Sequence, residues 1–218
     1  MPIELKRAFA AEALGTLLLT AAVIGSGVMA ERLCDNAGLM LLVNALATGA
    51  ALYGLILAFA PISGAHFNPA VSLMLVLAGR LPRAQFLFYA TAQVSGALAG
   101  MLLAHAMFEL PLLQVSQHVR SGAGQWLSEA VATFGLLLTV FSIREAKTAA
   151  AAIALYIVAA YWFTASTSFA NPALALARGF SDTFAGIRPV DTAVFIVVQL
   201  AVAFACARLL PSLFPERK

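Results

Sequence analysis

Six stretches of this chain are apolar over the length that a membrane helix needs. At 1.5 Å of rise per residue, about 20 predominantly apolar residues cross the hydrocarbon core of a bilayer. The stretches that qualify lie at residues 8–30, 38–60, 84–107, 124–143, 148–167 and 191–210. Charged or proline-containing breaks separate several of them, as at Arg80 to Arg83 and at Arg144 to Lys147. The pattern predicts an all-α membrane protein with six transmembrane helices.

Two further apolar stretches, residues 68–79 and 171–180, are too short to span a bilayer. Each begins with Asn-Pro-Ala, at Asn68, Pro69 and Ala70 and again at Asn171, Pro172 and Ala173. Asn is a preferred N-cap residue, and Pro is favoured at the first helical position because its missing N–H would have had no partner there. Two helix starts at matched places in two halves of the chain predict half-helices that meet inside the membrane, around a pore or binding site.

The two halves of the chain repeat one another. The matched positions are Glu12 with Glu129, Gly15 with Gly135, and Gln93 with Gln199. Because each half contains three spans, the second half enters the membrane from the opposite side, and the repeat is inverted. We expect a single domain over residues 1–218, with repeats at about 1–115 and 116–218, and close helix packing at Gly96 and Gly100.

Composition agrees with a membrane protein. Hydrophobic residues make up 62% of the chain and charged residues 11%, with a mean hydropathy of +0.92, whereas soluble domains carry about 25% charged residues. There is no basic block of the kind that binds nucleic acid. The two cysteines, Cys34 and Cys206, form no metal-binding or disulfide pattern. We expect no metal and no cofactor.

The positive residues predict the orientation. With the N-terminus inside, nine of them lie on the cytoplasmic side and four outside, as the positive-inside rule requires. The inner set is Lys6, Arg7, Arg80, Arg83, Arg144, Lys147, Arg208, Arg217 and Lys218, and the outer set is Arg32, Arg120, Arg178 and Arg188. We expect the protein in the cell (inner) membrane, with both termini in the cytoplasm. Trp126 and Tyr161 to Phe163 would form an aromatic belt at the outer interface. The first span is expected to remain uncleaved, because Glu12 interrupts it and no small-residue cleavage site follows.

Two Asn-Pro-Ala copies in an inverted repeat are a specific signal, and the sequence resembles the aquaporin, or major intrinsic protein, family over nearly the whole chain. The motifs that carry the resemblance are Ala11-Glu12 with Gly15-Thr16, Ser63 to Val71, Ala92-Gln93 with Gly96, Ser128-Glu129, and Asn171-Pro172-Ala173. The resemblance implies a bundle of six tilted spans, two half-helices meeting at its centre, and a homotetramer with one pore per subunit. It also implies facilitated diffusion with no bond broken, and so no enzyme.

The resemblance assigns roles along the pore. Asn68 and Asn171 would present their amides to solute passing in single file, and His66 would line the cytoplasmic half. The positive ends of the two half-helices repel cations, and neutral solutes feel them much less. Buried Glu12 and Glu129 have two interpretations: a proton relay, or acceptors for the N–H groups of the loop before each half-helix. Their symmetric placement favours the second.

The narrowest point of the family's pore is usually formed by four positions, and the one directly after the second Asn-Pro-Ala is usually Arg. Here it is Leu174, and spacing from the two Asn residues assigns the other three to Thr48, Ala159 and Ser168. This set has no ring and no cation, so the resemblance implies a wide, neutral selectivity filter.

Three other side chains bear on that filter. Phe169 or Tyr53 could fill part of the space. Arg178, four residues after Leu174, could restore the missing cation, although we expect it about 6 Å further outward, in the outer vestibule.

Residues Phe163 to Ala173, with Leu174, also resemble a bacterial subgroup associated with arsenic resistance. We expect a passive channel for glycerol, arsenous acid and related metalloids, with methylated arsenicals as further candidates, and water. One alternative is a water-selective channel, since the loops after the half-helices are short. Another is a proton-coupled transporter that uses Glu12 or Glu129. An enzyme finds no support, because no nucleophile–base pair or metal cluster occurs at plausible spacing.

Overall fold

The computed structural model describes residues 3–215 of the chain and shows a helical bundle. The long helices are α1 (Ile3–Leu33), α2 (Ala37–Ser63), α4 (Phe86–Met107), α5 (Ala123–Ser142), α6 (Ala146–Phe163) and α8 (Pro189–Leu213). The short ones are α3 (Pro69–Leu77), α7 (Pro172–Arg178) and the 3₁₀ turn η1 (Arg83–Gln85). Within residues 3–215 there is no strand. Six helices are long and apolar enough to cross a membrane, so the predicted fold class is confirmed.

The end of α6 differs from its predicted bound. The helix ends at Phe163 instead of residue 167, because Thr164 turns to an extended conformation and its hydroxyl bonds the carbonyl of Ala160. At its start, the Glu145 carboxylate accepts the N–H groups of Lys147 and Thr148 and caps the first turn. The connection from α6 to the second Asn-Pro-Ala is therefore a seven-residue loop, Thr164–Ala170, which begins with a turn.

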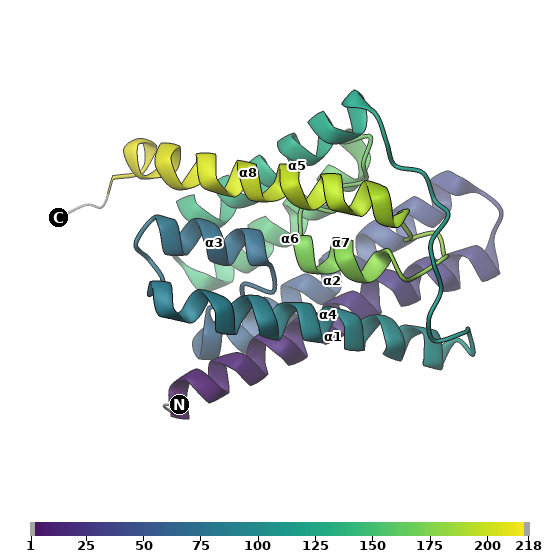
Figure 1. Cartoon of the computed structure of the whole chain (residues 1–218), viewed down its shortest axis with the longest axis horizontal. Coiled ribbons are helices and arrows are strands. Elements are labelled where there is room, and N and C mark those ends of the chain that lie inside the picture. Colours follow the sequence, from purple (N-terminus) through teal and green to yellow (C-terminus); the bar gives the residue numbers. More distant parts are fainter. Residues whose placement is uncertain (1–2, 216–218) are drawn as a thin grey trace.

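Both chain termini lie at one end of the bundle, which we call the terminal end (Figure 1). The half-helices α3 and α7 lie inside the bundle, α3 running from the middle toward the terminal end and α7 toward the opposite end. Each packs against α4 and α8. This is the arrangement that an inverted repeat predicts, with two helix N-termini facing each other near mid-height.

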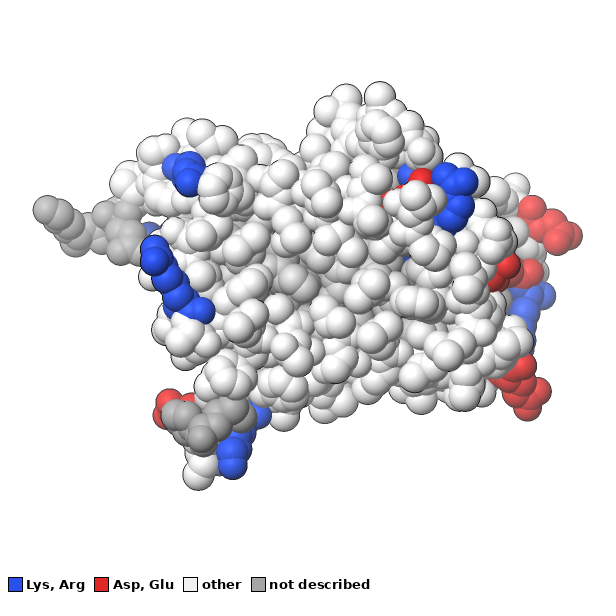
Figure 2. Space-filling view, viewed as in Figure 1, with Lys and Arg blue, Asp and Glu red and all other residues white. Residues whose placement is uncertain are grey.

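A broad band without charged residues separates the charged residues of the two ends on the face shown in Figure 2. Large aliphatic side chains stand exposed on the outer helix faces, among them Leu127, Leu155 and Val197. Exposed apolar area of this extent is stable in lipid and unstable in water. The molecule is therefore a multi-pass membrane protein. Arg217 and Lys218, counted above among the inner charges, lie outside the described residues.

Two glycines bring α4 unusually close to α1. A Cβ atom at Gly96 would lie 2.2 Å from the carbonyl oxygen of Ala13, and one at Gly100 would lie 2.2 Å from that of Leu17. No side chain fits at either place. The small-residue pair that the sequence contains is thus the contact surface between the two helices.

Candidate functional site

The two Asn-Pro-Ala motifs meet at the centre of the bundle and brace each other. Asn68 caps α3 by accepting the Ala70 N–H at 2.8 Å, and Asn171 caps α7 by accepting the Ala173 N–H at 3.0 Å. The amide nitrogen of Asn68 donates to the carbonyl of Ala170 at 2.7 Å, and that of Asn171 donates to the carbonyl of Phe67 at 2.8 Å. Since an amide NH₂ carries two hydrogens, each Asn keeps one donor for a solute.

The loops before the two half-helices are held in a strained conformation. Ala65 and Phe67 in the first loop have φ values of 51° and 49°, and Thr167, Ser168 and Ala170 in the second have 60°, 50° and 46°. A side-chain-bearing residue in this left-handed region costs of the order of 1–3 kcal/mol. The strain persists only if other contacts fix the loop.

The buried carboxylates of Glu12 and Glu129 supply these contacts. Glu12 accepts the N–H groups of His66 at 2.9 Å and Phe67 at 2.7 Å, together with the Gln93 amide at 2.7 Å. Glu129 occupies the same position in the second repeat: it accepts the N–H groups of Phe169 and Ala170, both at 2.9 Å, and the amide of Gln199 at 2.6 Å. With their oxygens fully engaged, the carboxylates act as anchors of the loop backbone, and the geometry favours that interpretation over a proton relay.

One cavity of about 340 Å³ extends along the bundle past both asparagines. Its wall runs from Arg144 and Ala146 at the terminal end, past Asn68 and Asn171, to Arg178 at the opposite end. Much of the rest is aliphatic, contributed by α1, α2, α5 and α6: Leu19, Val23, Leu52, Ile56, Leu136, Val140, Ile153 and Ile157. No carboxylate is among the described lining residues, and the charged ones are both arginines.

Three of the four predicted filter residues line this cavity. Thr48, Ser168 and Leu174 are buried, with exposed fractions of 4%, 3% and 6%, and all three belong to the wall. Ala159 does not: it is exposed on the outer face of α6 and absent from the described lining. The assignment of Ala159 was wrong. Ungapped counting from Asn171 took α6 to continue to residue 167, whereas the helix ends at Phe163 and the loop before Asn171 is longer.

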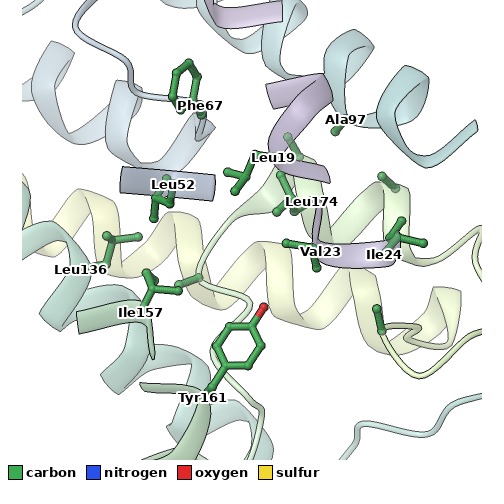
Figure 3. Packing of buried hydrophobic residues seen from close by; sticks show 14 of the residues in the cluster. Leu19, Val23, Ile24, Leu52, Phe67, Ala97, Leu136, Ile157, Tyr161 and Leu174 are labelled. Atoms are coloured by element: carbon green, nitrogen blue, oxygen red, sulfur yellow. The ribbon is translucent and has the colours of Figure 1, made fainter. Parts of the chain in front are cut away.

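Tyr161 takes the place that was predicted for Ala159. It lies about 200° around the helix from Ala159, is 3% exposed, and places its hydroxyl 3.2 Å from the hydroxyl of Thr48. Figure 3 shows the ring near Ile157, with the hydroxyl on the side of Val23 and Leu174. The cavity wall beside Thr48 therefore contains a ring, which the predicted set lacked, and Tyr161 is buried instead of standing in an exposed aromatic belt.

A signal for Tyr161 was present in the sequence. Ile153, Ile157 and Tyr161 follow each other at intervals of four and form one face of α6, which the structure places on the cavity. The helical period would have found the residue that loop counting missed. Tyr53, the other ring considered for this space, is 43% exposed and is not in the described lining.

The opposite end of the cavity carries Phe169 and Arg178. Both line the wall, and the Arg178 guanidinium carbon lies 3.3 Å from the centre of the Phe169 ring. The Nε of Arg178 donates to the carbonyl of Ala185. Arg120, from the segment between α4 and α5, lies 5.1 Å from the same ring. Sequence reasoning placed Arg120 outside but gave it no role.

His66 lines the cavity on the side of the first motif. Its Nδ1 lies 3.0 Å from the hydroxyl of Ser72, and its ring stacks at a tilt on Tyr89, with centroids 4.9 Å apart. The ring is thus fixed in orientation by α3 and α4. It adds a polar edge to a largely aliphatic wall.

Comparisons with known proteins agree with this architecture. Residues 2–158 match the family model described as major intrinsic protein. The chain is 54% identical over 209 residues to the aquaglyceroporin AqpS of Rhizobium meliloti (strain 1021), covering 95% of this chain and 90% of that protein. It is 34% identical over 156 residues to the probable aquaporin PIP2-8 of Oryza sativa subsp. japonica, covering 66% of this chain and 54% of that one.

A solved structure extends the match to the fold. The aquaglyceroporin from Plasmodium falciparum superposes with a TM-score of 0.77 at 22% identity, over 96% of this chain and 98% of that one. At that identity the similarity shows the fold alone. Taken with the paired asparagines, the central cavity and the family match, it leads to one conclusion: the chain is a member of the major intrinsic protein family, a membrane channel for small neutral solutes and not an enzyme.

Proposed function

We propose that this channel passes glycerol, arsenous acid and related metalloid acids, with methylated arsenicals and water, by facilitated diffusion. The observation that carries the proposal is that Leu174 and hydroxyl-bearing residues line the same cavity. Leu174 stands directly after the second Asn-Pro-Ala and lines the wall, while Thr48 and Tyr161 add two neighbouring hydroxyls to that wall.

This wall is suited to polyhydroxyl solutes. A hydroxyl both donates and accepts, so Thr48, Tyr161 and Ser168 can exchange hydrogen bonds with a solute that carries several O–H groups. The aliphatic side chain of Leu174 offers no fixed donor and contacts the carbon or arsenic framework. The 54% identity with a relative named an aquaglyceroporin supports the same substrate class.

A water-selective channel is the second candidate, and Tyr161 is the observation in its favour. A ring of this size reduces the cross-section that a Thr-Ala-Ser-Leu filter would have left open. The two candidates predict different ratios of glycerol permeability to water permeability.

We further propose that the protein works as a homotetramer in the cell (inner) membrane with both termini in the cytoplasm. The excess of Lys and Arg at the terminal end supports this orientation. In this orientation Arg178 belongs to the outer vestibule and His66 to the cytoplasmic half.

Stopped-flow light scattering on proteoliposomes tests the proposal. Water and glycerol permeability are recorded on one preparation, with uptake of arsenous acid and a methylated arsenical measured alongside. We expect glycerol and arsenous acid to enter at least about tenfold faster than into empty liposomes, a difference of roughly 1.4 kcal/mol in barrier. Fast water flux with neither solute passing would select the water-channel alternative.

A further inference from the structure

Two guanidinium groups lie close to the Phe169 ring, at the end of the cavity opposite to the terminal end. Their central carbons lie 3.3 Å (Arg178) and 5.1 Å (Arg120) from its centroid. They come from segments far apart in the chain, α7 and the stretch between α4 and α5. Phe169 also packs edge-on against Phe195 at 5.3 Å, which fixes the ring. A rigid aromatic platform therefore holds two like charges close together.

No carboxylate neutralises these charges by direct contact. In the part of the chain that the structure describes, neither Arg178 nor Arg120 forms an ion pair. The nearby carboxylates are committed to other groups. Asp191 pairs with Arg188 at 3.0 Å, and its contact with Arg120 is to the backbone N–H and not to the guanidinium. Glu129 accepts the N–H groups of the second loop.

The two arginines differ in their free donors. Arg120 donates four hydrogen bonds, to the carbonyls of Gly186, Ser166 and Phe184 and to the Thr167 hydroxyl, and all three of its nitrogens take part. Arg178 uses only its Nε, toward Ala185, so its two terminal nitrogens have no hydrogen-bond partner among the described residues. The side chain is 2% exposed and lines the cavity.

A second unpartnered polar group lies on the same wall. The Ser168 hydroxyl is buried and has no hydrogen-bond partner among the described residues. Its residue precedes Phe169 and lines the cavity with Arg178. Buried polar atoms are almost always paired, so the unpaired Ser168 hydroxyl, on the same cavity wall as the unpartnered terminal nitrogens of Arg178, indicates a ligand that accepts from both.

We propose that Arg178 and Ser168 form a binding site for a small monovalent oxyanion of the carboxylate type, with Arg120 adding positive charge. The site lies on the same cavity wall that the neutral solutes pass, but it would bind an anion. A guanidinium binds the two oxygens of a carboxylate through paired N–H donors, and a serine hydroxyl supplies a third donor. The absence of carboxylates from the described cavity wall removes the usual repulsion.

Direct binding tests the proposal independently of which neutral solute the channel passes. Carbon-13-labelled formate is titrated into purified full-length protein in detergent, and saturable line broadening of its NMR signal is recorded, with chloride at matched ionic strength as the reference anion. We expect the formate signal to broaden saturably, and an equal concentration of chloride should not displace the bound formate. Non-saturable broadening, or displacement by equal chloride, would overturn the assignment of an oxyanion site.

Three variants assign the site to its residues. Arg178→Gln should abolish the saturable component, and Ser168→Ala should weaken binding about tenfold, the usual effect of losing a hydrogen bond to a charged group. The matched control is Arg32→Gln, which removes a guanidinium that also lies on a phenylalanine ring at the same end, Phe108, and should bind formate as the wild type does. If Arg178→Gln does not fold, Ser168→Ala decides alone. Formate affinity unchanged in the folded Arg178 and Ser168 variants would refute the site.

Discussion

At the scale of single residues, the filter that we propose combines hydroxyl groups with an aliphatic side chain. Thr48 and Tyr161 contribute two hydroxyls that bond each other at 3.2 Å, and Leu174 occupies the position after the second motif. Hydroxyls can rotate to donate or accept. The filter can thus exchange its internal hydrogen bond for one with a passing solute, at little net cost.

Replacing Tyr161 by Phe tests this exchange. The variant keeps the ring and removes the hydroxyl, so we expect glycerol permeability to fall about five-fold, as loss of one hydrogen bond of about 1 kcal/mol predicts. Tyr156→Phe is the matched control on the same helix, since the Tyr156 hydroxyl bonds the Ala132 carbonyl and the residue lies off the described cavity wall. Equal glycerol permeability in Tyr161→Phe and wild type, measured by stopped flow, would remove Tyr161 from the solute path.

Glu12→Gln distinguishes an anchor from a proton relay. The carboxylate accepts two backbone N–H groups and two side-chain donors, and a Gln amide would turn an NH₂ group against some of them. Each buried donor left unpaired costs about 1–3 kcal/mol, so we expect lower thermal stability in detergent with passive flux falling in proportion to folded protein. A relay predicts the reverse: normal stability, and loss of a flux that runs against a solute gradient.

At the scale of elements, the sequence predicted the helices better than the connections between them. Two Asn-Pro-Ala motifs mark the half-helices because capping and proline placement are local effects, readable from a few residues. The position of the filter on α6 depends instead on where the helix stops, which the Thr164 hydroxyl and the Ala160 carbonyl decide. Ungapped counting from Asn171 therefore gave Ala159, while the helical period of Ile153, Ile157 and Tyr161 leads to the correct face.

Two glycines give predictions of opposite sign, one at the contact of α1 with α4 and one on α5. Gly96→Ala places a Cβ against the Ala13 carbonyl, and overpacking of this kind costs about 1–3 kcal/mol. Gly124 in α5 has nothing within 4 Å of the same position, so Gly124→Ala should leave stability equal or raise it by up to about 1 kcal/mol through helix propensity. Thermal unfolding of both variants in detergent is the measurement. A Gly96→Ala protein as stable as the wild type would show that the two helices can separate freely.

At the scale of the whole molecule, the outside and the inside of the bundle are built for different environments. The uncharged band of Figure 2 and the large apolar side chains exposed on the outer helix faces suit lipid. The cavity wall combines aliphatic side chains with asparagine amides and with the hydroxyls of Thr48, Tyr161 and Ser168. The two half-helix N-termini at its centre disfavour cations. The charged residues on the described wall, Arg144 and Arg178, carry the same sign at the two ends.

We propose that Leu174 keeps the filter neutral and open to glycerol, and a comparison of two Leu174 variants tests this. Water and glycerol permeability of Leu174→Arg are measured by stopped flow on proteoliposomes, with Leu174→Val as the control that keeps an aliphatic side chain. The claim predicts that the ratio of glycerol to water permeability falls at least about tenfold in Leu174→Arg, a barrier increase of roughly 1.4 kcal/mol, and stays close to the wild-type ratio in Leu174→Val. An unchanged ratio in Leu174→Arg would contradict it.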